Sequence, residues 1–292
     1  MAKGRVGIIG GTGLGQALGM LGQGEQREVD TPFGRPSGPI TLAEVGGVPV
    51  ALLARHGEGH MLNPSQVPYR ANIFALKALG VTHVLASGAV GSLREHIEPR
   101  QLVIPDQVID KTFRRAGTFF DELAAHVELS QPFCSTLRGC LLSASQGGVR
   151  VHRQGTYVCM EGPQFSTRAE SELHRAWGGD LIGMTVMPEA KLAREAELCY
   201  ALVALPTDYD CWRPHPAELD AATLLREIIG HLKAATQNAV ELLRRALPGV
   251  YEVMDQPCRC QSALALAIFS DRDRLSEATK EKLRPLLARY LG

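Results

Sequence analysis

The chain alternates short apolar runs with longer segments whose apolar residues recur at helical spacing. Apolar runs of about four to eight residues between turn residues are typical of buried strands, and a period of about 3.6 indicates amphipathic helices. The pattern predicts strands at residues 6–10, 48–54, 83–88, 101–104, 155–160 and 199–206. It predicts helices at residues 68–79, 130–144, 165–177, 188–197 and 217–246. This alternation indicates an α/β fold: a single domain with a central mixed β-sheet flanked by helices.

The composition changes only near the C-terminus. After Pro248 a connector with two cysteines precedes an apolar run at 262–268 and a polar segment that predicts a helix at 276–291. We expect residues 1–247 to form the main domain and residues 248–292 to form a C-terminal extension packed on it. No internal repeat or low-complexity segment is present.

The charge balance and composition exclude several classes of partner. The 31 basic and 31 acidic residues cancel, and aromatic residues make up 5% of the chain. No overall field therefore favours nucleic acid or an anionic membrane, and few rings are offered for base stacking. The apolar run near the start is too short for a signal peptide, and no stretch reaches the ~18 apolar residues of a membrane span. We expect a cytoplasmic protein that binds a small molecule.

The seven cysteines are spread along the chain. Most stand singly in apolar segments, as buried free thiols do. Cys258 and Cys260 form a C-x-C pair, which could be a disulfide, contribute two metal ligands or remain as two thiols. No second paired cluster in the sequence completes a tetrahedral zinc site, so no metal is expected.

Two carboxylates follow the apolar run at 199–206. Asp208 and Asp210 are two residues apart, so in an extended backbone they point to the same face at the carboxyl end of a strand. Open α/β sheets bind their ligands at this edge. A solvated turn after a strand would give the same local pattern.

Three further segments after predicted strands suit an anion. The glycine-rich turn at 7–14 offers free N–H groups and the hydroxyl of Thr12, although its spacing fits neither the dinucleotide fingerprint nor the P-loop. Arg55 and His56 follow the second strand, and arginine's planar fork suits phosphate. The adjoining HGEGH segment does not fit the zinc-protease motif H-E-x-x-H. The third segment, 87–92, has small residues with free N–H groups, so phosphate is indicated as a reactant.

Read in order, several motifs resemble the trimeric purine nucleoside phosphorylases, and within them the 5'-methylthioadenosine phosphorylase branch. The similarity runs from about residue 6 to 212. It is carried by GIIGGTGL, LARHGEGH, ASGAVGS, YVCMEGPQFSTRAE, IGMTVMPEAKLAREA and TDYDCW. The resemblance implies a homotrimer, with a hexamer left open. It also implies reversible phosphorolysis of methylthioadenosine to adenine and 5-methylthioribose-1-phosphate, with inorganic phosphate as co-substrate and no cofactor.

The resemblance also assigns site residues. It implies a phosphate site formed by Thr12, Arg55, His56, Gly88, Ala89 and Thr185. Relatives often have a hydroxyl or amide side chain where this chain has Gly88. For the nucleoside, the resemblance implies Phe165 and Ser166 at the base, Met184 under the ribose, and Asp208 and Asp210 at the purine ring.

The resemblance implies an apolar wall around the sugar's 5' substituent. The corresponding positions are Ala221, Leu224 and Leu225, with His126 reaching in from a neighbouring subunit. A helix face of leucines is also typical of an ordinary core.

Asp208 has the chemistry of an adenine reader. A carboxylate accepts a hydrogen bond from the amino group of a 6-aminopurine, and a protonated carboxyl donates to ring nitrogen 7 as the leaving base gains charge. Two alternatives stay open. One is a phosphorylase of the same fold acting on adenosine, inosine or methylthioinosine, and the other is a non-catalytic nucleotide-binding module.

Overall fold

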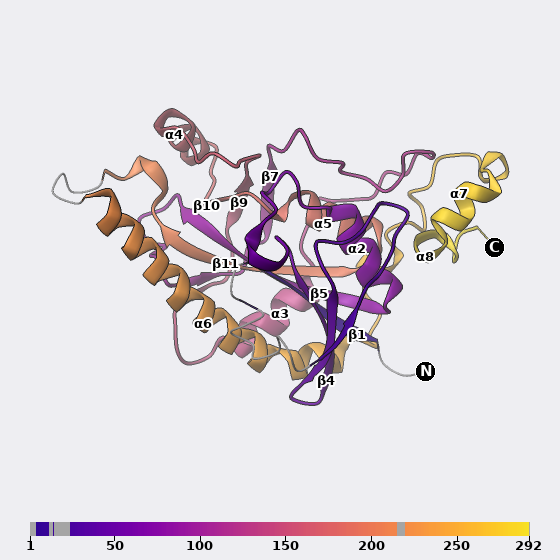
Figure 1. The fold of residues 1–292 in the computed structure, drawn as a ribbon, viewed down its shortest axis with the longest axis horizontal. Coiled ribbons are helices and arrows are strands. Elements are labelled where there is room, and N and C mark those ends of the chain that lie inside the picture. The colour runs from indigo at the N-terminus through magenta and orange to yellow at the C-terminus, as the bar shows by residue number, and fades with distance from the viewer. Residues whose placement is uncertain (1–3, 12–13, 15–23, 215–219, 292) are drawn as a thin grey trace.

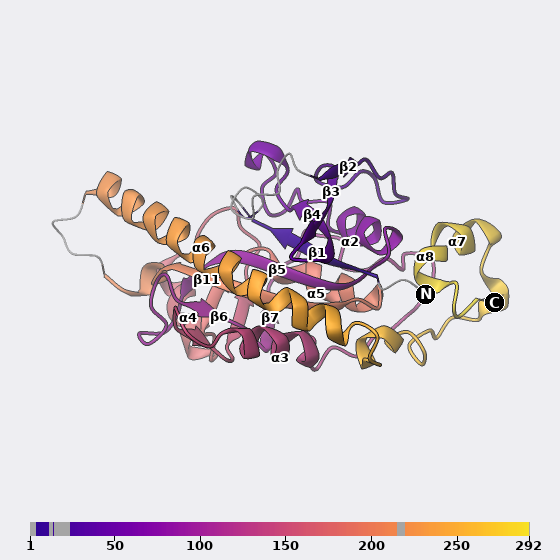
Figure 2. The same ribbon diagram turned by 90° about the horizontal axis from the view of Figure 1, so that it is seen from below.

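The computed structural model describes residues 4–11, 14, 24–214 and 220–291. These residues form one mixed sheet with helices on both faces (Figures 1 and 2). The predicted α/β fold with a central mixed sheet is therefore confirmed. The strands are β1 (Arg5–Gly10), β2 (Glu25–Arg27), β3 (Ile40–Val45), β4 (Val48–Ala54), β5 (Val81–Ser92), β6 (Leu102–Val103), β7 (Gln107–Asp110), β8 (Val151–His152), β9 (Thr156–Cys159), β10 (Leu181–Gly183) and β11 (Cys199–Asp208).

The strand order brings the candidate segments together. The sheet runs β2-β3-β4-β1-β5-β10-β9-β7, and β11 pairs with both β5 and β6. Strands β4, β1, β5 and β11 are parallel neighbours. Their carboxyl ends therefore lie at one edge of the sheet, where the residues after each strand can share a site.

The helices cover the two faces of the sheet and enclose two apolar cores. Helices α2 and α5 pack into one core with Ile9 and Leu202, while α3 and α6 pack into the other with Ile8 and Val203. Successive strand residues alternate between the cores because side chains of a strand point to opposite faces. The helices are α2 (Tyr69–Ala78), α3 (Ser135–Ala144), α4 (Arg168–Ala176), α5 (Val186–Glu195), α6 (Ala221–Val253), α7 (Glu277–Lys282) and α8 (Arg284–Leu287).

The six predicted strands are all present, but the sheet contains more. Strand β5 extends to Ser92, beyond the predicted end at residue 88. Strands β2, β3, β7, β8 and β10 were not predicted from the sequence. Most of these have four residues or fewer, and β3 joins β4 through the Gly46–Gly47 turn, where both glycines have positive φ angles.

Several predicted helix boundaries were wrong. Helix α4 begins at Arg168, not at residue 165, because Thr167 and Glu170 form a capping box there. Helix α6 continues through Pro248 to Val253, since packing of its apolar face outweighs the proline. The terminal helix is two short helices, α7 and α8, because Pro285 at the start of α8 cannot continue a preceding helix.

The segment after α6 packs against the helix α2 side of the molecule. Leu264, Leu283 and Leu287 are buried in the same core as α2. The carboxylate of Glu197 accepts hydrogen bonds from the Leu264 N–H at 3.0 Å and the Tyr290 hydroxyl at 2.5 Å. In the described part of the chain, no helix is both long and apolar enough to span a membrane.

The structure brings together cysteines that are far apart in the sequence. Cys134 and Cys199, which stand alone in the sequence, lie beside Cys258 and Cys260, and the four sulfur atoms all lie within 4.8 Å of one another. The sequence could not show this because the four residues come from three separate segments.

Candidate active site

A cavity of about 460 Å³ opens at the carboxyl edge of the sheet, where the sequence predicted the site. It brings together nine of the predicted site residues. These are Arg55, His56, Gly88, Ala89, Phe165, Met184, Thr185, Asp208 and Asp210. Thr12 lies outside the described residues, and the neighbouring Gly11 lines the cavity.

Arg55 follows β4 and is buried, with 1% of its surface exposed. Its Nε and Nη2 donate to the two carboxylate oxygens of Glu189 at 2.7 and 2.8 Å, and its Nη1 donates to the Ser87 carbonyl at 2.8 Å. The hydroxyl of Tyr200 also donates to Glu189, at 2.7 Å. Although burial disfavours the cation, the Glu189 carboxylate raises the pKa of Arg55. The guanidinium stays charged, and its Nη atoms carry further N–H groups for a ligand in the cavity.

Glu189 is a functional residue that the sequence analysis missed. It lies in the segment IGMTVMPEAKLAREA, but it is 134 residues from Arg55 in the sequence. The sequence offered one signal for it: Glu189 stands among apolar residues of a predicted helix. An acid that is almost completely buried there needs a partner of opposite charge.

His56 lies next to Arg55 and presents a neutral ring. Burial, followed by the charge of Arg55, lowers the pKa of His56 to about 4. Its Nδ1 lies 2.8 Å from the Leu62 carbonyl, which can only accept, so Nδ1 carries the proton. In the neutral ring Nε2 is therefore an acceptor, and it becomes a donor only when the ring gains a proton.

Gly88 and Thr185 lie close together in the cavity wall. A Cβ atom built on Gly88 would lie 3.4 Å from the Thr185 hydroxyl and 4.0 Å from Nη1 of Arg55. Thr185 precedes α5 and is mostly buried, and its side chain makes no capping hydrogen bond to that helix. Thr185 lines the cavity near Arg55.

Asp208 and Asp210 also line the cavity; Asp208 ends β11, and Asp210 begins the short 3-10 helix that follows it. Asp208 accepts hydrogen bonds from the Thr207 hydroxyl at 2.6 Å and from the Asp210 backbone N–H at 2.8 Å. Asp210 has a positive φ of 49° and accepts from the Ser171 hydroxyl at 2.5 Å. A Cβ on Gly91 would lie 3.2 Å from the Asp208 carboxylate and 2.9 Å from Ile182, so the glycine lets β5 approach the two carboxylates closely.

Phe165 and Met184 complete the middle of the cavity. Phe165 is 85% exposed, so its ring face is accessible to a flat ligand. Ser166 does not line the cavity, but its hydroxyl donates to the sulfur of Met160 and its carbonyl accepts from Cys211, and both partners do line it.

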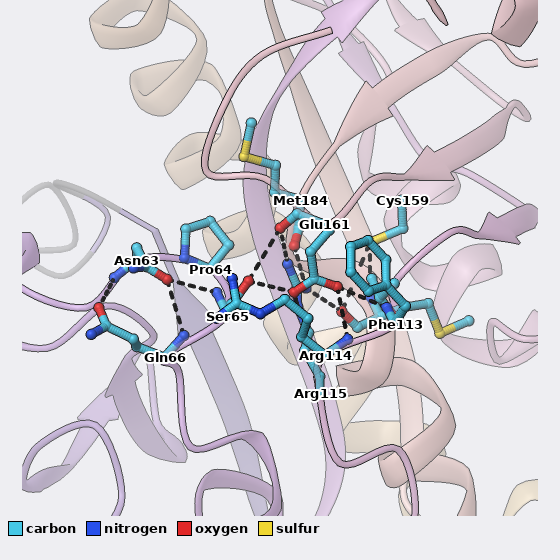
Figure 3. A network of polar contacts seen from close by, with 12 residues as sticks. Asn63, Pro64, Ser65, Gln66, Phe113, Arg114, Arg115, Cys159, Glu161 and Met184 are labelled. Carbon is cyan, nitrogen blue, oxygen red and sulfur yellow. Dashed lines mark hydrogen bonds and ion pairs between the residues drawn. The ribbon is translucent and has the colours of Figure 1, made fainter.

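A second buried ion pair supports the loop that carries Met184 (Figure 3). Arg115 pairs with Glu161 at 3.2 Å and donates to the carbonyls of Met184 and Met187 at 2.5 and 2.7 Å. Glu161 also accepts from the Ser65 hydroxyl and the Phe113 N–H. This network joins four segments of the chain, those of Ser65, Arg115, Glu161 and Met184, and Arg115 was not predicted from the sequence.

Three residues predicted for the 5' wall belong to the first turns of α6. Ala221, Leu224 and Leu225 do not line the cavity, and Leu225 is 57% exposed. The cavity is lined instead by Ile228, Leu232 and Thr236, beginning one turn further along the same helix.

His126, the other residue predicted for this wall, is not in the cavity. It lies in the loop between β7 and α3, and its ring packs against Phe269 at 5.3 Å.

The fold and cavity define an α/β protein with a cavity at the carboxyl edge of its sheet, lined by a buried arginine and by two carboxylates. A family model described as "Phosphorylase superfamily" matches residues 5–248, and the chain belongs to this family.

Several proteins of known function are similar to this chain over nearly its whole length. The S-methyl-5'-thioadenosine phosphorylase of Thermosynechococcus vestitus is 48% identical, over 98% of this chain and 99% of its own length. That of Koribacter versatilis is also 48% identical, over 98% and 97%. The crystal structure of a methylthioadenosine phosphorylase from an antarctic soil metagenomic library is 43% identical with a TM-score of 0.87, covering 98% of this chain and all of that one. The Schistosoma mansoni enzyme in complex with tubercidin is 34% identical with a TM-score of 0.82, covering 91% and 99%.

Proposed function

We propose that this chain catalyses the reversible phosphorolysis of S-methyl-5'-thioadenosine. The observation that carries the proposal is that Arg55 and Asp208 line the same cavity. Arg55 offers N–H donors to phosphate, and Asp208 offers a carboxyl group to the purine. The relatives named above give the substrate, since each is called a methylthioadenosine phosphorylase or an S-methyl-5'-thioadenosine phosphorylase.

In the proposed reaction a phosphate oxygen bonds to the sugar's anomeric carbon as the bond to ring nitrogen 9 breaks. The bonding electrons pass to the purine, while the sugar gains positive charge that the phosphate stabilises. Arg55 and the Thr185 hydroxyl hold the phosphate. Inorganic phosphate is the co-substrate, and the proposal needs no metal or organic cofactor.

Asp208 reads the base in this proposal. Ionised, it accepts from the exocyclic amino group of adenine, whereas a 6-oxopurine would place oxygen against oxygen. To donate to ring nitrogen 7, Asp208 must carry a proton. Exclusion of water by the bound purine favours the neutral carboxyl, which takes its proton from solvent. Asp210 holds Asp208 in place through its backbone N–H.

The experiment that tests this function is a panel of nucleosides assayed with and without phosphate. We expect fast, phosphate-dependent release of adenine from methylthioadenosine and slower turnover of adenosine, inosine and methylthioinosine. Preference for a 6-oxopurine nucleoside would favour the alternative phosphorylase. Absence of any phosphate-dependent base release would favour a non-catalytic nucleotide-binding module.

Asp208→Asn tests the assigned residue. Asparagine is nearly isosteric and keeps an acceptor for the Asp210 N–H, and the Thr207 hydroxyl can accept from its amide. Turnover of methylthioadenosine should nevertheless fall by roughly 10²–10⁴, the usual contribution of a general acid. Methylthioinosine should lose less, since the amide can donate to its oxygen.

The measured quantity is the ratio of kcat/KM for methylthioadenosine and methylthioinosine at saturating phosphate. Asp30→Asn is the matched control, because Asp30 is exposed and forms an ion pair with Arg35 at the surface. This variant should leave the ratio unchanged. An unchanged ratio in Asp208→Asn would show that this residue does not read the base.

The proposal includes a homotrimer in the cytoplasm, with a hexamer left open. In it His126 reaches a neighbour's cavity, so activity requires assembly. Light scattering at the assay concentration tests this, and an active monomer would remove His126 from the site.

A further inference from the structure

We propose that Cys134, Cys199, Cys258 and Cys260 bind one structural zinc ion. The four sulfur atoms lie within 4.8 Å of one another, and those of Cys134 and Cys258 are 3.7 Å apart. Zinc–sulfur bonds of about 2.3 Å in a tetrahedron place sulfur atoms about 3.8 Å apart. The cluster therefore needs only a small contraction to enclose the ion.

The separations do not fit a disulfide as they stand. A disulfide requires sulfur atoms about 2.05 Å apart, well below the 3.7 Å between Cys134 and Cys258. All four cysteines are free thiols in the structure. A set of four thiolates is typical of zinc or iron, and this spacing fits a single ion.

The surroundings of the cluster suit a closed structural site. Cys134, Cys199 and Cys260 are each at most 2% exposed, and Cys258 packs at the edge of the same apolar core. A closed site with four protein ligands and no open position is the arrangement of structural rather than catalytic zinc. Cys199 begins β11, so the cluster lies nine residues, or roughly 30 Å of extended strand, from Asp208.

Nearby charges oppose the net negative charge that four thiolates and Zn²⁺ would have. Cys134 immediately precedes α3, whose N-terminus favours a thiolate. Arg194, 4% exposed, donates to the carbonyls of Glu128 and Gln131 in the segment that leads to Cys134. Arg259, between the two cysteines of the C-x-C pair, donates to the Gln131 side chain.

The site would fasten the segment after α6 to the body of the fold. Cys258 and Cys260 belong to this segment, while Cys134 immediately precedes α3 and Cys199 begins β11 in the body. Figures 1 and 2 both show α3 alongside the C-terminal half of α6, which leads into the C-x-C turn. Binding involves no oxidation: the ion replaces the thiol protons, which pass to solvent.

The first test is metal analysis of the full chain, expressed with added zinc and purified without chelator. We expect about one zinc per chain, falling to near zero in Cys258→Ser and in Cys260→Ser. Cys140→Ser is the matched control, because Cys140 lies in α3 outside the cluster. Iron in place of zinc would overturn the assignment of the metal.

Thiol titration of the wild-type chain keeps the proposal testable even if the variants do not fold. We expect the four cluster thiols of the folded protein to react only after a chelator is added, with no need for a reductant. The melting temperature should fall with chelator and stay unchanged with dithiothreitol. If fewer than seven thiols react after chelator and a reductant restores the rest, the cysteines form disulfides. If all seven thiols react and no metal is bound, the cysteines are free. Either result overturns the proposal.

Discussion

Two buried arginine–glutamate pairs lie near the cavity. They differ in where the arginine N–H groups that do not bind the glutamate carboxylate are directed. Arg55–Glu189 is 1% exposed on each side chain, and Arg115–Glu161 is 2% and 6% exposed. Arg55 lines the cavity, whereas Arg115 does not. Arg115 instead directs its Nη groups to Tyr69 and to the carbonyls of Glu161, Met184 and Met187.

The difference teaches how similar ion pairs can have different roles. A buried pair is weak evidence for stability by itself, because desolvation offsets the attraction between the charges. Glu189 fixes the Arg55 guanidinium and leaves N–H groups facing the cavity. The donors of Arg115 are directed to protein carbonyls, so it shapes the loop with Met184. We therefore expect the first pair to control phosphate affinity and the second to control stability.

Removal of Arg55 should have the largest effect. Each lost charge-assisted hydrogen bond to phosphate costs about 1.5–3 kcal/mol, so the loss of two should lower kcat/KM for phosphate by about 10²–10⁴. Arg55→Ala also leaves Glu189 buried without its partner, so Arg55→Lys is measured beside it. Lysine keeps the charge but loses the fork, and KM for phosphate should rise in both variants.

Arg70→Ala is the control for Arg55, since Arg70 pairs with the exposed Asp121 outside the cavity. It should leave KM for phosphate unchanged. Equal phosphate kinetics in Arg55→Lys and the wild type would contradict the assignment of the anion site.

Arg115→Ala should mainly lower the free energy of unfolding. Removing one partner of a buried pair typically costs about 3–5 kcal/mol, here because Glu161 remains buried. Chemical denaturation measures this loss. KM for methylthioadenosine should rise as the Met184 loop loses support, while KM for phosphate changes little. A change in phosphate KM as large as that of Arg55→Lys would remove the distinction between the two pairs.

The histidine beside the first pair should make stability depend on pH. The pKa of His56 falls from 6.5 to about 4 on folding, so the unfolded chain binds the extra proton between these values. This contribution to stability is present above pH 6.5 and is lost as the pH falls toward 4, with a slope of up to about 1.4 kcal/mol per pH unit. Unfolding of the wild type and His56→Gln should be compared between pH 7 and 5. The variant should show the shallower dependence, and identical slopes would mean that His56 is charged in the fold.

The smallest effect should come from Gly88→Ser. The cavity has room for the new Cβ, which would lie 3.4 Å from the Thr185 hydroxyl. A hydroxyl that donates to phosphate contributes about 0.5–1.5 kcal/mol, so KM for phosphate should fall by about 2- to 10-fold. Gly91→Ser is the matched control, because its Cβ would lie 2.9 Å from Ile182 and crowd Asp208. That variant should lose activity, and a higher KM for phosphate in Gly88→Ser would mean that the site cannot use a hydroxyl there.

The sequence by itself determined the long buried strands of the sheet and the edge where the candidate site lies. Apolar runs predicted β1, β4, β5 and β11, since a buried strand must be apolar on both faces. Polar residues directly after such runs, such as Arg55 and Asp208, must lie at the carboxyl edge of a parallel sheet. The topology of the sheet then brings them into one cavity.

Only the tertiary structure decided which distant side chains meet. Glu189 and Arg55 pair across 134 residues, and Cys134 meets Cys258 across 124. No local spacing encodes such contacts, because they depend on how the helices pack on the sheet. The same packing places Ile228 rather than Leu224 at the cavity wall. Periodicity gives the apolar face of a helix, but the position of the helix along the sheet decides which turn of that face meets the ligand.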